Sequence, residues 1–236
     1  MTNSRAITSG RAGVVDIGAI FLIAAPVVLL LLNIWVEAAW SVAYSWASNN
    51  ISDLGNVNCG LFDGREICSP RHAVFNIGMM VVGCLFGAGV VLAGSGWGRG
   101  RRATLARTGI LLAAAGYVLV GIFPADVNLG MHLLAALLVM PVGSIGMVIS
   151  GFVPGDAVLW RVRWVARTLG AAAFIASYLH VAGPWLGIGK GGMERIAVFT
   201  LPVWLGGLGG YLLSTARRSG ARSLFARGNQ RGGGCA

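Results

Sequence analysis

The chain has 236 residues, of which 56% are hydrophobic and only 11% are charged. A soluble domain carries about 25% charged residues, so this composition predicts a protein whose main solvent is lipid. A net charge of +10 could indicate nucleic-acid binding, but the basic residues lie in segments between apolar runs and not along one polar face. We therefore expect an integral membrane protein that binds no nucleic acid.

The apolar runs predict an all-α, polytopic bundle of six transmembrane helices, since about 20 residues cross the hydrocarbon core. The spans are expected at about residues 14–36, 72–94, 108–123, 128–152, 165–188 and 195–213. The first span could instead be a cleaved signal peptide, but such a peptide has an apolar region of only about 7–15 residues, so we expect the span to be retained.

Polar segments flank this transmembrane domain of residues 14–214. Residues 1–13 are expected to form a poorly ordered tail and residues 215–236, rich in Arg and Gly, a disordered one. Within the spans, the glycine pairs Gly83/Gly87 and Gly206/Gly210 have the spacing that lets helices approach closely.

The basic residues also predict the orientation of the bundle. Fourteen of the eighteen Lys and Arg residues lie in 1–13, 95–107, 153–167 and 214–236. The other four are Arg65, Arg71, Lys190 and Arg195. Because basic residues concentrate on the cytoplasmic side, we expect both termini in the cytoplasm of a multi-pass protein of the cell (plasma) membrane. The long loop at 48–71 then faces outward.

Cysteine usage agrees with this orientation. Cys59 and Cys68 share the outer loop, where oxidation is permitted, while Cys84 lies in a span and Cys235 in the C-terminal tail. A Cys59–Cys68 disulfide is therefore expected. A metal-binding pair is the weaker alternative, because the CxxC spacing is absent.

Polar residues that could carry chemistry gather on the outer side. The candidate catalytic residues there are Ser52, Asp53, Asp126 and His132, and the candidate metal ligands are His132, His180 and Asp126. Such side chains could bind a divalent ion such as zinc or perform acid–base chemistry.

Each of these residues also has a structural interpretation. Asp126 precedes a predicted helix and could be only its N-cap, and residues 49–55 could be an ordinary turn. His72, next to Arg71, is more simply a boundary residue. If the cluster is real, we expect Asp53 within ion-pair reach of Arg195 or of the turn at 126–128, and His132 facing the bundle interior.

Four short motifs occur in order along the chain: Asn-Ile-Ser-Asp-Leu-Gly at 50–55, Phe-Asn-Ile-Gly at 75–78, Gly-Ile-Phe-Pro-Ala-Asp at 121–126, shortly before His132, and Gly-Met-Glu-Arg-Ile at 192–196. With these motifs the chain resembles, over residues 14–214, the bacterial and archaeal membrane family catalogued as domain of unknown function 998. The resemblance implies an integral membrane protein and supplies no activity.

Two functions remain open from the sequence. The first is a protein that binds or transports a lipid headgroup or small solute in an outward-facing polar pocket, and we favour it because no specific catalytic motif is present. Its candidate binding residues are Asn50, Asp53, Asn76, Asp126, His132, His180, Glu194 and Arg195. The alternative is a metal-dependent hydrolase acting on lipid at the outer leaflet, by analogy with ceramidase-type membrane hydrolases. Only the alternative implies a cofactor, zinc, and neither predicts an oligomeric state.

Overall fold

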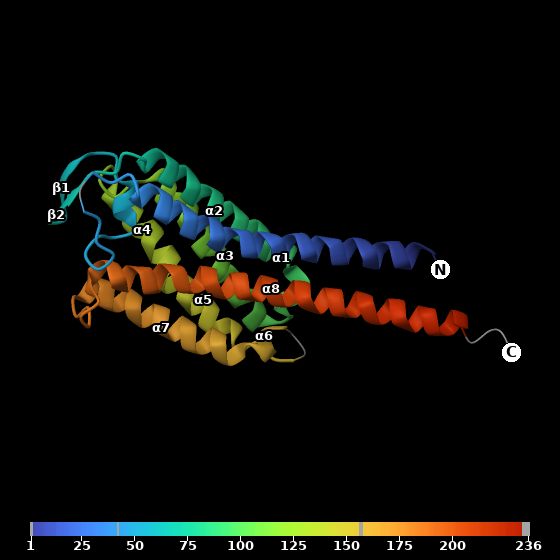
Figure 1. Ribbon diagram of the computed structural model, residues 1–236. Helices are drawn as coiled ribbons and strands as arrows, with labels where there is room; N and C mark the ends of the chain where they lie inside the picture. The colour runs from blue at the N-terminus through green and yellow to red at the C-terminus, as the bar shows by residue number, and fades with distance from the viewer. Residues whose placement is uncertain (1, 42, 156–157, 233–236) are drawn as a thin grey trace.

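The chain folds into a helical bundle, described by a computed structural model over residues 2–41, 43–155 and 158–232 (Figure 1). Within these residues, six helical segments are long and apolar enough to cross a bilayer, which confirms the predicted fold class. They are α1 (Thr2–Glu37), α2 (His72–Leu92), α3 (Arg101–Ile122), the continuous run α4 (Leu129–Leu137), η3 (Leu138–Val142) and α5 (Gly143–Ser150), then α7 (Arg163–Ala182) and α8 (Gly189–Gly232).

The spanning helices form a closed ring in chain order. Each packs against the next, and α8 returns to pack against α1. Both termini lie at one end of the bundle, which we call the terminal end, together with η2 (Gly94–Trp97) and α6 (Val158–Arg161) (Figure 1). The opposite end carries η1 (Ser52–Gly55) and the strands β1 (Gly60–Phe62) and β2 (Arg65–Ile67), and we call it the hairpin end (Figure 1).

Several helix boundaries differ from those expected. α3 begins at Arg101 and not near residue 108, and α8 begins at Gly189 and not near 195. Hydropathy identifies the residues that contact the lipid chains, but a helix can extend beyond them into the polar headgroup layer. The first turns of α3 and α8 contain charged residues, so hydropathy alone places them in loops. α7 ends earlier than expected, at Ala182, because Gly183 takes the left-handed conformation that closes many helices (φ 104°).

The outermost helices continue into the segments expected to be tails. α1 begins at Thr2, and α8 runs through Gly232 in place of leaving the helix near residue 213. The added segments both contain Ala and Arg, which favour helix. Residues 1 and 233–236 of the expected tails lie outside the described residues.

Proline interrupts the fourth span. Its middle turn, Leu138–Val142, is a π-helical turn that contains Pro141. Proline has no backbone N–H to donate within a helix, and single π turns are a common way to absorb such a break.

Glycines set the close helix contacts. A Cβ added at Gly83 would lie 2.6 Å from the Ala114 carbonyl oxygen, so α2 and α3 meet there. On α8, Gly206 and Gly209 face α1: a Cβ at Gly209 would lie 2.6 Å from the Ala19 oxygen, whereas Gly210 has open space. The second expected pair is thus wrong by one residue, because spacing alone does not show which face of a helix meets its neighbour.

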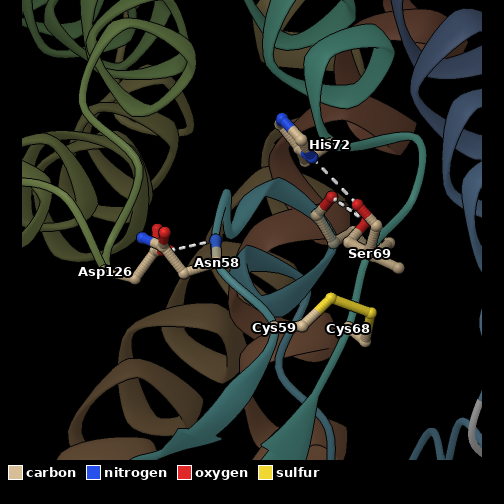
Figure 2. The surroundings of a disulfide bond; sticks show 7 residues. Asn58, Cys59, Cys68, Ser69, His72 and Asp126 are labelled. Carbon is tan, nitrogen blue, oxygen red and sulfur yellow. Dashed lines mark hydrogen bonds between the residues drawn. A yellow bond between two sulfur atoms is a disulfide. The ribbon is translucent and has the colours of Figure 1, made fainter.

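The hairpin end begins with a short antiparallel β-hairpin. β1 pairs with β2 in the register Gly60↔Ile67. The two-residue turn between them, Asp63–Gly64, has positive φ at both positions (47° and 73°), as such hairpin turns require. A disulfide joins Cys59 and Cys68 at the base of the hairpin (Figure 2), as the sequence predicted.

Candidate functional site

The segment 49–56 is folded into the hairpin end of the bundle, and we call it the capping segment. All its residues except Ser52 are buried, and the Asp53 side chain is only 1% exposed. A buried loop must find hydrogen-bond partners for its polar groups within the protein. Partners for most of these groups come from β2, α2, α8 and the loops on either side, so the segment is more than an ordinary turn.

Asp53 is bound from both sides. It accepts hydrogen bonds from the Asn50 backbone N–H (2.8 Å) and, more weakly, from the Asn49 side-chain amide (3.4 Å). Arg65 donates to both of its carboxylate oxygens, from Nε at 3.0 Å and Nη2 at 2.9 Å. Burial alone lowers the pKa of Arg65, but the bonds to Asp53 and Asp63 outweigh burial and raise the pKa, so the guanidinium stays charged.

The predicted partner of Asp53 is therefore wrong. The observed partner is Arg65 on β2, and neither Arg195 nor the turn at 126–128. The hairpin folds back over the capping segment and brings Arg65 to a carboxylate twelve residues earlier, which requires a strand register that residue spacing does not reveal.

Arg195 instead joins the start of α8 to residues 44–49, the loop that leads into the capping segment, by donating to backbone carbonyls. Its Nη1 donates to the oxygens of Trp46 (2.9 Å), Asn49 (2.7 Å) and Gly191 (2.9 Å). Its Nη2 donates to the Tyr44 hydroxyl (2.6 Å). All these acceptors are neutral, and no carboxylate in the described part of the chain forms an ion pair with Arg195. Its positive charge is anchored but not neutralised.

Tyr44 completes this attachment. Burial raises its pKa above the ordinary value, with Arg195 partly opposing that effect, so the phenol is neutral at physiological pH. The hydroxyl therefore accepts from Arg195 and donates to the Asn50 carbonyl (3.1 Å). The Arg195 guanidinium also lies 5.5 Å from the centre of the Tyr44 ring and 5.0 Å from that of Trp46, within cation–π range.

The far end of the capping segment is held by α2 and the loop that precedes it. Asn76 donates to the Gly55 carbonyl (3.0 Å), and the Ser69 hydroxyl to the Leu54 carbonyl (2.7 Å). A Cβ at Gly55 would lie 2.4 Å from the Asn76 side-chain oxygen, so the contact needs glycine. His72 is 2.9 Å from the Ser69 carbonyl (Figure 2), which makes it a structural residue.

A small cavity lies beneath the capping segment, inside the ring of helices. Its volume is about 30 Å³. His132 and Glu194, each 7% exposed, line it together with Ser52, and His132 thus faces the interior as expected. The remaining walls are Ile51, Phe75, Met79, Tyr117, Val120, Ala136, Val139, Met140 and Val198. The cavity is small and mostly apolar, and the capping segment contributes Ile51 and Ser52 to its lining.

Asp126 has a different role from those considered. Its carboxylate accepts from the backbone N–H (2.8 Å) and side-chain amide (2.9 Å) of Asn58, which ties the α3–α4 loop to the base of the hairpin (Figure 2). The N-cap of α4 is Asn128, which accepts from the Met131 N–H. Asp126 is thus neither the helix cap nor part of the cavity lining.

The three candidate metal ligands do not come together. His132 and His180 each place Nδ1 against a backbone carbonyl, that of Phe123 (2.8 Å) and that of Lys190 (3.0 Å). Asp126 is bound to Asn58, and over the residues that the structure describes no three His, Cys, Asp or Glu side chains are arranged to hold a metal ion. The expected set His132, His180 and Asp126 is therefore not a metal site.

An apolar groove, not expected from the sequence, runs along the outside of the bundle over α8, and we call it the α8 groove. It has a volume of about 390 Å³. Its apolar walls are Leu30 of α1, Leu169 of α7, and Ile196, Phe199 and Val203 of α8, with Thr200 among them. Trp46 and Arg195 line its hairpin end, and Trp46 also borders a neighbouring hollow at Glu37, Trp40 and Tyr44. The sequence signal that could have located this region is the cluster of aromatic residues at and after the end of the first span, Trp35, Trp40, Tyr44 and Trp46.

The comparisons with known proteins give one result. The model of the family described as "Protein of unknown function (DUF998)" matches residues 22–211, which include every spanning helix in whole or in large part. The searches of curated proteins and of solved structures found no match. The chain therefore belongs to the DUF998 family, whose members are proteins of unknown function.

Proposed function

We propose that the protein binds a membrane phospholipid, with one acyl chain in the α8 groove and the lipid phosphate beside Arg195. The observation that carries this proposal is the pairing of an apolar groove with an uncompensated guanidinium at one end of it. The hairpin end then faces the outside of the cell and both termini face the cytoplasm, which the distribution of basic residues supports.

The direction of the groove fits an acyl chain. Ile196, Phe199 and Val203 follow one another on one side of α8 at helical spacing, away from Arg195. From residue 196 to 203 the helix rises about 10 Å, roughly along the direction in which lipid chains lie in a bilayer. Thr200, the polar group among these walls, donates to the Ile196 carbonyl and leaves the surface apolar.

The groove is also placed where only lipid can fill it. It lies between α1 and α7 on the surface of a six-span bundle, outside the ring of helices. A small polar solute would lose its hydration there without gaining hydrogen bonds. The lining therefore favours a lipid over the small solute that the sequence left open.

Arg195 supplies the polar end of the site. A phosphate oxygen is a stronger acceptor for a guanidinium than a neutral carbonyl, and arginine is preferred where phosphate is recognised. Trp46 stands beside it with its indole N–H bound to both Glu37 carboxylate oxygens (2.8 and 2.9 Å), which fixes the ring at the groove. Tryptophan at this position is typical of the membrane–water interface.

Lipid retention by purified protein tests the proposal. The protein is reconstituted with phosphatidylglycerol or with diacylglycerol, which has the same chains but no phosphate, and the lipid retained is counted by native mass spectrometry. We expect Val203→Trp, which fills the groove, to reduce retained phosphatidylglycerol several-fold. Val91→Trp is the matched control, because Val91 is similarly exposed (55% against 60%) on α2.

The polar end is tested separately. Arg195→Gln should abolish the preference for phosphatidylglycerol over diacylglycerol while chain binding persists. Equal retention by Val203→Trp, Val91→Trp and the unaltered protein would overturn the proposal, even if Arg195→Gln loosens the loop that it anchors.

A further inference from the structure

We infer that Glu194 and His132 form a buried proton-binding site, bridged by water in the cavity beneath the capping segment. The α8 groove lies on the other side of the same helix start, at Arg195, and this inference does not depend on the lipid proposal. The site takes up a proton from the hairpin side and holds it within the bundle.

The cavity has the size of a water site and not of a solute site. A cavity needs about 10–15 Å³ of this kind of volume per water, so 30 Å³ accommodates about two waters. Two waters are enough to connect two polar side chains that line the same small cavity. The walls come from η1, α2, α3, the fourth span and α8.

Glu194 is the acidic side of the site. Glu194 is only 7% exposed, and its carboxyl accepts a hydrogen bond from the Ile51 backbone N–H of the capping segment. Among the described residues no cation lies within ion-pair distance of it. A carboxyl at membrane depth with no ion-pair partner is expensive to keep charged and usually has a functional role.

His132 is the basic side. Its Nδ1 lies 2.8 Å from the Phe123 carbonyl oxygen, and because a carbonyl can only accept, Nδ1 must carry the hydrogen. The lone pair of a neutral ring is therefore on Nε2, free to take a proton. When the Glu194 O–H bond breaks, its proton passes to the bridging water while that water gives a proton to His132 Nε2, which leaves a carboxylate and an imidazolium with no net change in charge.

Other ionisable groups around Glu194 set the balance between these two states. They are His180 from α7, Asp53 from the capping segment, Tyr44 from the loop before the capping segment, Arg195 from α8 and, on the cavity wall, Tyr117 from α3. His180 binds the Lys190 carbonyl through Nδ1 and is only half-buried, whereas Glu194 and His132 are buried. We therefore assign proton entry to His180, the more exposed imidazole of the group.

Infrared titration of the purified protein tests the site. The carbonyl band of a protonated carboxyl is followed as pH rises, and one such band should be absent from Glu194→Gln. In His132→Gln the carboxyl has lost the imidazolium that stabilises its ionised form, so the band should persist to a pH about one unit higher. His72→Gln is the matched control, because His72 has the same Nδ1-to-carbonyl bond but lies outside the cavity.

A band that survives in Glu194→Gln, or a midpoint that is the same in His132→Gln and the unaltered protein, would overturn the inference. The titration is repeated with sodium in place of potassium at constant ionic strength. The inference predicts no difference, and a midpoint that falls with sodium would assign the cavity to a metal cation and contradict a proton site.

Discussion

The two ends of the bundle differ in how their basic side chains are paired. At the hairpin end, two of the four cations meet carboxylates within the protein: Arg65 binds Asp53 and Asp63, and Lys190 binds Asp63. These are the ion pairs found among residues 13–215 with described side chains, and all lie at this end. Asp53 and Asp63 thus neutralise two of the cations at this end and hold the hairpin against the bundle. The other two cations, Arg71 and Arg195, meet carbonyls and aromatic rings.

At the terminal end, arginines meet aromatic rings and carbonyls. Arg167 donates to the Gly151 carbonyl (2.8 Å) and lies 3.9 Å from the centre of the Phe152 ring. Arg163 lies 4.3 Å from the centre of the Trp160 ring. These contacts position the side chains without neutralising them, so the excess positive charge remains at the surface of this end.

The difference bears on both the site and the proposed orientation. In that orientation, the uncompensated cations of the terminal end would face the anionic lipid surface of the cytoplasmic leaflet, which attracts basic residues by about 1 kcal/mol each. At the hairpin end, the internal ion pairs instead hold the capping segment over the cavity.

The largest effect is expected from removing the buried cation. Arg65→Gln leaves the Asp53 carboxylate buried without a charged partner, and breaking a buried ion pair from one side costs about 3–5 kcal/mol. Arg167→Gln, the matched substitution at the terminal end, leaves no charge behind and should cost about 1 kcal/mol. Thermal unfolding in detergent measures both, and equal losses would show that the two ends do not differ in this way.

A smaller loss is expected when the disulfide is removed. In the chain-entropy description, closing a loop of about ten residues stabilises by roughly 2–3 kcal/mol. Cys59→Ser with Cys68→Ser should therefore make the hairpin end more sensitive to protease, with little change at the terminal end. Alkylation of intact cells should label neither Cys59 nor Cys68 until a reductant is added. Labelling of Cys59 without reductant would contradict the bond.

Features that depend on composition were predicted correctly from the sequence, whereas contacts that depend on strand register or on helix packing were missed. The six spans, the disulfide and the polar character of one end followed from hydropathy, cysteine position and charge. The Asp53–Arg65 pair depends on a hairpin register, and the bond from the Ile51 N–H to Glu194 joins residues 143 apart. The α8 groove was missed because each of its apolar walls looks like any lipid-facing residue until three helices are assembled.

The smallest effect concerns the tip of the hairpin. Hydrogen bonds from Lys190 and then from Arg65 lower the pKa of Asp63, so its contribution to stability is present above the carboxyl's ordinary pKa and is lost as pH falls through the lowered value. Because Asp63 is exposed and screened by salt, Asp63→Asn should cost less than about 1 kcal/mol at pH 7. The unfolding temperature is compared at neutral and acid pH, at low and high salt. A loss that persists unchanged at acid pH would show that these ion pairs are not its source.

The orientation of the bundle is the central claim, because the proposed lipid site on the outer side rests on it. A phosphatase that folds only outside the cytoplasm is inserted after Gly64, in the hairpin turn, or fused after Ala236. We predict enzyme activity from the Gly64 insertion and none from the Ala236 fusion. The reverse pattern would place the hairpin end in the cytoplasm and contradict the account.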